Sequence, residues 1–178
     1  DGAEEESIDG VGLFRSEFLY SAADKKPSCE EQIKAYRDVI LKARPNGVTV
    51  RTLDAGGDKQ LEYLGMEKEE NPFLGNRGIR LCLNNPEIFG EQLRAILIAA
   101  AGEKVKIMLP MVSSLNEIRK TKAMICDIQS ELEAVGVEYC KNPQIGIMIE
   151  TPASAVMAET FAKYSDFFSI GTNDLVQY

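Results

Sequence analysis

Charged and amide side chains follow four of the apolar segments that have strand character. They are Arg15 and Glu17, Arg51 and Asp54, Glu150, and Asn173 with Asp174. A single charge at a strand end is more often only solvated, but four such ends in one chain indicate a site. Guanidinium groups suit phosphate or carboxylate oxygens, and carboxylate and amide oxygens suit Mg²⁺. The set therefore predicts a metal site for a small phosphorylated or carboxylated anion.

The residue types that are missing narrow the chemistry further. The 178 residues include no His, which excludes Ser-His-Asp and Cys-His nucleophilic sites within this chain. Phosphoryl transfer and enolate chemistry depend mainly on positioning and charge stabilisation, so they are compatible with this composition. The four cysteines include no C-x-x-C pair and are predicted to be reduced packing residues of a cytoplasmic protein: Cys29, Cys82, Cys126 and Cys140.

Five short apolar segments, β-branched or flanked by glycine, are predicted to position these side chains as strands. They span residues 10–14, 48–50, 105–109, 145–149 and 167–170. Helices are predicted between them, opening at Ser28 with Glu31, at Asn85-Pro86, at Ser114 with Glu117, and at Thr151-Pro152. The long stretch from Asp54 to Gly78 has the composition of a loop.

Alternating strands and helices with nearly continuous hydrophobic strands predict an α/β fold with a parallel sheet. The spacing favours a partial (β/α)₈ TIM barrel with about five of its eight strand–helix units, although an open sheet fits the periodicity nearly as well. In a barrel the polar strand ends meet at the carboxyl rim, where active sites are built. We expect one domain over residues 1–178, incomplete at both ends.

Charge and hydropathy exclude other classes of partner. The net charge is −8, and no Lys/Arg-rich run is present, so we expect no nucleic-acid partner. No apolar stretch approaches the roughly 20 residues that span a bilayer, so we expect no membrane insertion.

A second cluster lies in the predicted loop. It contains Gly56-Gly57-Asp58-Lys59 and, farther along, Arg77. Glycine-rich loops are as often simple turns as anion contacts, so this cluster alone leaves both interpretations open.

Together, the motifs of the chain resemble those of the phosphoenolpyruvate-utilising enzymes, in order and through the whole sequence. The segments that carry the resemblance span residues 10–19 (GVGLFRSEFL), 51–54 (RTLD), 71–77 (NPFLGNR), 149–152 (IETP) and 167–175 (FFSIGTNDL). This family includes enzyme I of the bacterial sugar phosphotransferase system, pyruvate phosphate dikinase and phosphoenolpyruvate synthase. The stretch from Asp54 to Lys59 is similar to the enzyme I branch.

The resemblance implies a phosphoenolpyruvate-binding barrel and a role for each matching residue. Arg15 and Arg51 are expected to hold the phosphate, and Asn173 and Asp174 to contact the substrate. Lys59 and Arg77 match further positions of the family's substrate pocket, and Glu150 and Asp174 are the implied Mg²⁺ ligands. No catalytic residue is expected in this chain, because the acceptor histidine and the cysteine proton donor of the family lie outside it.

The reaction implied by the resemblance is transfer of the phosphoryl group to a histidine on an N-terminal domain, then to a histidine-containing phosphocarrier protein. The resemblance also implies a homodimer for the longer protein and an inactive fragment if this chain stands alone. Two alternatives remain. One is a fragment of pyruvate phosphate dikinase or phosphoenolpyruvate synthase, and the other is a non-catalytic dimerisation module.

Overall fold

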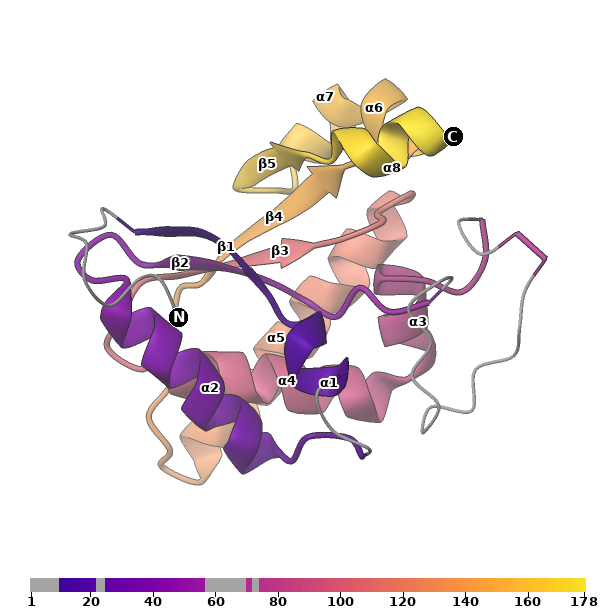
Figure 1. The fold of residues 1–178 in the computed structure, drawn as a ribbon. Coiled ribbons are helices and arrows are strands. Elements are labelled where there is room, and N and C mark those ends of the chain that lie inside the picture. The colour runs from indigo at the N-terminus through magenta and orange to yellow at the C-terminus, as the bar shows by residue number, and fades with distance from the viewer. Residues whose placement is uncertain (1–9, 22–24, 57–69, 72–73) are drawn as a thin grey trace.

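The computed structural model describes residues 10–21, 25–56, 70–71 and 74–178 (Figure 1). Within these ranges the chain forms a single parallel sheet with helices packed against it (Figure 1). Lys59 and its neighbours Gly57 and Asp58 lie outside the described residues.

The sheet contains five parallel strands in the order β1-β2-β3-β4-β5. They are β1 (Val11–Arg15), β2 (Val48–Arg51), β3 (Val105–Leu109), β4 (Gln144–Ile149) and β5 (Phe167–Ile170). A doubly wound sheet reverses its strand order part-way, whereas here each strand lies beside the one before it in the chain. The sheet is also curled (Figure 1). The α/β class and the partial barrel are therefore confirmed, and the open-sheet alternative is not.

Eight helices occur in the described residues. They are α1 (Glu17–Ser21), α2 (Cys29–Lys42), α3 (Ile79–Asn84), α4 (Pro86–Ala99), α5 (Leu115–Ala134), α6 (Pro152–Val156), α7 (Ala158–Ala162) and α8 (Thr172–Gln177). The four predicted helices correspond to α2, α4, α5 and α6. The short helices α1, α3, α7 and α8 were not predicted.

The predicted caps begin the helices as expected at α2, α5 and α6, and at α6 Ser154 N donates to Thr151 Oγ1 at 3.1 Å. At α2, Ser28 N donates to Glu31 Oε2 at 2.7 Å and Glu31 N donates to Ser28 Oγ at 3.2 Å, which is a reciprocal capping box. At α5, Glu117 Oε2 accepts from Ser114 N at 2.8 Å. Asn85 precedes α4 without a side-chain cap, because its amide donates to Leu81 O of the preceding helix.

The core lies between the sheet and helices α2, α4 and α5 (Figure 1). Alternate residues of the central strands, such as Ile107 and Ile147, belong to one buried cluster with Leu93 of α4 and Ile118 of α5. On β3, Lys106 and Met108 flank Ile107 and lie outside the cluster, as the two-residue period of a strand requires. Burial of one sheet face thus fixes the register, and with it the side chains that emerge at the carboxyl ends.

The four cysteines are all free. Cys82 and Cys140 are buried, and burial raises the pKa of both thiols. A raised thiol pKa disfavours the nucleophilic thiolate, in agreement with the packing role predicted for these two. Cys126 is exposed on α5, so the predicted packing role is wrong for that residue. No helix in the described part of the chain is long and apolar enough to cross a membrane.

Candidate functional site

Two strand-end arginines meet at the carboxyl end of the sheet. Arg15 ends β1, Arg51 ends β2, and the two residues are register partners in the parallel pair. One carboxylate oxygen joins them, because Glu17 Oε1 accepts from Arg15 Nε at 3.2 Å and also from Arg51 Nη2. The arginines predicted from the strand ends therefore do converge.

Arg51 is the more enclosed of the two. Its side chain is 7% exposed, against 46% for Arg15. Asp54 Oδ2 lies 3.4 Å from Arg51 Nη2, and Nη1 contacts the Met148 sulfur at 3.7 Å. Arg51 Nε has no hydrogen-bond partner in the residues that the structure describes. Arg51 thus keeps a donor at a buried position beside the rim.

A buried ion-pair network continues from Asp54 to α8. Arg77 donates from Nε and Nη2 to the two carboxylate oxygens of Asp54, at 3.1 and 3.2 Å. Its Nη1 lies 2.9 Å from Asp174 Oδ1. Burial works against the charge of Arg77, but its bonds to Asp54 and Asp174 outweigh burial and raise its pKa. Arg77 therefore links the strand-end carboxylate Asp54 to the predicted metal ligand Asp174.

Glu150 follows β4 and is fully buried. Its Oε1 accepts from Met111 N at 2.6 Å. Burial raises the pKa of Glu150 to about 7, helped by the charges of Asp54 and Asp174 and opposed by the Met111 N–H and Arg51. Asp54 and Asp174 thus add negative charge beside Glu150.

The geometry around Glu150 also fits a metal ion. The buried Oε2 has no hydrogen-bond partner among the described residues. A Cβ at position 171 would lie 2.6 Å from this oxygen, so the glycine there leaves space beside it. No group of three or more potential protein ligands occurs within the described ranges. Mg²⁺ commonly uses one or two carboxylates and completes its shell with water and phosphate, so Glu150 and Asp174 suit it.

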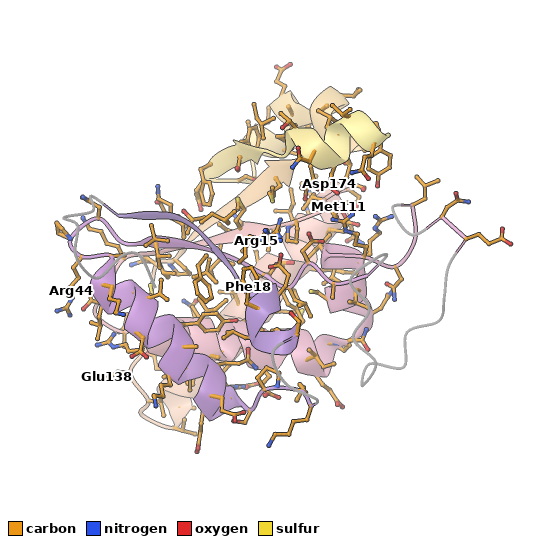
Figure 2. All side chains as sticks on the ribbon, viewed as in Figure 1. Arg15, Phe18, Arg44, Met111, Glu138 and Asp174 are labelled. Carbon is orange, nitrogen blue, oxygen red and sulfur yellow. The ribbon has the colours of Figure 1, made fainter. Side chains whose placement is uncertain are left out.

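The remaining predicted residues differ in how well the structure places them. Asn173 is exposed on α8, next to Asp174, and Lys59 lies outside the described residues. Figure 2 shows Arg15, Met111 and Asp174 toward one end of the sheet, whereas Arg44 and Glu138 lie toward the opposite end. Arg15 and Asp174 thus both lie on the carboxyl side of the sheet (Figure 2), and Asp174 is linked to Asp54 through Arg77.

Two supporting residues were missed by the sequence reasoning. Met111 has a positive φ of 60°, a strained conformation for a non-glycine residue that is typical of functional sites, and no sequence signal marks it. Gln92 is buried on the apolar helix α4, where its Oε1 accepts from Leu53 N at 2.9 Å and its Nε2 donates to Ser16 Oγ at 3.1 Å. Because α4 also carries Glu87, Glu91 and Arg94, no clear sequence signal marked Gln92.

The whole chain, residues 1–178, matches the family model described as PEP-utilising enzyme, PEP-binding domain. The chain belongs to the PEP-utilising enzymes. In this family member, Arg15, Arg51 and the buried carboxylate of Glu150 lie at the carboxyl rim of the sheet.

Curated relatives of this PEP-utilising chain carry the name phosphoenolpyruvate-protein phosphotransferase. The chain is 50% identical over 177 residues to the protein of that name from Staphylococcus carnosus. This aligned region covers 99% of this chain and 31% of the relative. The chain is 51% identical over 170 residues to the protein from Listeria monocytogenes, covering 96% of this chain and 30% of the relative. The chain thus spans about a third of the length of these relatives.

Proposed function

We propose that this chain is the phosphoenolpyruvate-binding part of an enzyme I, a phosphoenolpyruvate-protein phosphotransferase. The observation that carries the proposal is the pairing of Arg15 and Arg51 across the β1–β2 register. On the same rim lies the buried Oε2 of Glu150, which no described residue contacts by a hydrogen bond. Fixed guanidinium forks recognise phosphate, and a buried carboxylate recognises a divalent cation. The name shared by the relatives supports the same function.

Each rim residue then has a role in binding. Arg15 and Arg51 hold the phosphate, while Asn173, Lys59 and Arg77 contact the substrate.

Glu150 and Asp174 hold Mg²⁺, with Asp174 also next to the substrate. When bound, Mg²⁺ supplies positive charge that stabilises the transferring phosphoryl group and the developing enolate. Arg77 orients Asp174 through their 2.9 Å ion pair.

The proposed reaction needs groups from outside this chain. The phosphoryl group leaves the enol oxygen of phosphoenolpyruvate as that P–O bond breaks, and a P–N bond forms to a histidine nitrogen. The released pyruvate enolate is then protonated. Because the chain contains no His, the acceptor histidine belongs to another part of the protein, and we expect this chain alone to bind without transferring.

The wider context is part of the same proposal. The phosphohistidine passes its group to a histidine-containing phosphocarrier protein of a sugar phosphotransferase system, in a cytoplasmic homodimer. A pyruvate phosphate dikinase or phosphoenolpyruvate synthase is disfavoured, because the relatives at about 50% identity carry the phosphotransferase name.

Substitution of Arg51 in the protein at its natural full length tests the function. We expect Arg51→Ala to lower phosphoenolpyruvate-dependent phosphorylation by at least about a hundredfold, because a preorganised hydrogen-bond donor to the phosphate is lost. The measurement is transfer of labelled phosphate from phosphoenolpyruvate to the protein.

Arg44→Ala is the matched control, because Arg44 is exposed and pairs with Glu103 at the other end of the sheet (Figure 2). Its turnover should equal that of the unmodified protein. Retained turnover in Arg51→Ala, with circular dichroism unchanged in both variants, would show that Arg51 does not hold the phosphate.

A further inference from the structure

Glu17 places one carboxylate oxygen between the two arginines that we propose to hold the phosphate. A single oxygen, Oε1, accepts from Arg15 Nε at 3.2 Å and from Arg51 Nη2. A phosphate oxygen shared by two guanidinium groups makes the same kind of charge-assisted contact. A phosphate bound by both arginines would therefore need the donors that Glu17 now occupies.

The environment makes this competition strong. The side chain of Glu17 is 10% exposed and that of Arg51 is 7% exposed. Water and salt screen charges poorly at such sites. A phosphate placed next to Glu17 would therefore feel its negative charge as well as the positive charge of the arginines.

Arg51 also has a second anchor that would remain if Glu17 moved away. Asp54 Oδ2 lies 3.4 Å from Arg51 Nη2. Arg15 is likewise held independently, because its guanidinium lies 5.4 Å from the centre of the Phe18 ring, within the range of a cation–π contact. Loss of the Glu17 contact thus leaves both arginines supported.

We infer that Glu17 is an internal counter-anion, which binds Arg15 and Arg51 in the ligand-free protein and is displaced by the phosphate of the substrate. The inference rests on the proposed function, since it assumes that these arginines bind phosphate. It makes Glu17 a residue that sets ligand affinity by competing with the ligand. A dianionic phosphate brings more charge to the arginines than the single carboxylate it replaces, so it gains from the exchange.

Calorimetric titration of the protein at its natural full length tests the inference, with inorganic phosphate and phosphoenolpyruvate as probes. Glu17→Gln keeps the size of the side chain and removes the competing charge. We expect both probes to bind roughly tenfold more tightly, since a juxtaposed like charge is removed. Glu138→Gln is the control, because Glu138 is exposed at the far end of the sheet (Figure 2), and it should leave both affinities unchanged.

A structural role for Glu17 predicts the opposite sign. If Glu17 serves to orient the arginines, Glu17→Gln weakens binding of both probes, and unchanged binding would likewise overturn the inference. Should Glu17→Gln fail to fold by circular dichroism, Glu17→Asp serves instead, because its shorter carboxylate reaches the two arginines less well. Tighter binding then supports displacement, and equal or weaker binding contradicts it.

The proposed function fails in a different way. If the unmodified protein binds neither phosphoenolpyruvate nor phosphate in the presence of Mg²⁺, the rim is not a phosphate site and both proposals fall. If it binds phosphoenolpyruvate normally while Glu17→Gln binds no more tightly, only the displacement of Glu17 is wrong.

Discussion

Individual side chains at the rim are held mainly by one another. Arg77 donates to both oxygens of Asp54 and pairs with Asp174, while Asp54 also lies 3.4 Å from Arg51. Asp54 and Arg77 are almost fully buried, so each depends on its partners for compensation of its charge. The candidate phosphate residue Arg51 and the candidate metal ligand Asp174 are thereby coupled through two buried residues.

Removal of Arg77 should reveal this dependence. We expect Arg77→Met to lower the free energy of unfolding by about 3 kcal/mol, because it removes the two hydrogen bonds to the buried Asp54 and leaves Arg51, 3.4 Å away, to compensate its charge. Urea denaturation measures the change.

The double variant Arg77→Met with Asp54→Asn provides the control for the interaction. Because Asn carries no charge, this pair should lose clearly less stability than the sum of the two single variants. Additive losses would show that Arg77 and Asp54 contribute independently.

At the scale of elements, the helix α2 depends on a cap with a pH-dependent contribution. Hydrogen bonds from Ser28 to the Glu31 carboxylate lower the pKa of Glu31 below its ordinary value. A carboxyl group with a lower pKa in the folded state adds stability above its unfolded pKa and loses it as the pH falls.

The stability difference between the unmodified protein and Glu31→Gln should therefore shrink between about pH 6 and about pH 3. Thermal unfolding across this range provides the measurement. A difference that stays constant with pH would contradict the role of the ionised cap.

Sequence reasoning located the strands well because each carries a β-branched or apolar run with turn residues at its ends. The predicted ranges of β3 and β5 agree with the observed Val105–Leu109 and Phe167–Ile170. The helices α1, α3, α7 and α8 contain five or six residues each, which is too short to show a helical period. Their existence depends on the tertiary fold.

The candidate site was predictable to a similar extent. Arg15 and Arg51 end their strands and Glu150 follows its own, and parallel strands bring their carboxyl ends to one edge. The contact between Arg77 and Asp174 depends on how the segment before α3 and the helix α8 are placed in the fold, which no local pattern specifies. The same is true of the left-handed Met111, whose N–H holds Glu150 at 2.6 Å.

At the scale of the whole molecule, strand order is what gathers the site. The order β1 to β5 follows the chain without reversal, so successive strand ends lie side by side around the curled rim (Figure 1). Among the described strands, β1 and β5 each pair on one side only, and Ile170 of β5 is 70% exposed. A barrel closes when such edges meet a further strand. The expected domain over residues 1–178, incomplete at both ends, stays a prediction.

The central claim is that this rim binds phosphoenolpyruvate together with Mg²⁺ through Glu150. The most direct measurement is calorimetric titration of phosphoenolpyruvate into the protein at its natural full length, with and without Mg²⁺, beside Glu150→Gln and Glu138→Gln. Glu150→Gln preserves the oxygen that accepts from Met111 N and removes the charge that would hold the metal.

We expect binding that requires Mg²⁺, a loss of at least about tenfold in affinity for Glu150→Gln, and no change for Glu138→Gln. Binding of equal strength without Mg²⁺, or in the Glu150→Gln protein, would contradict the account.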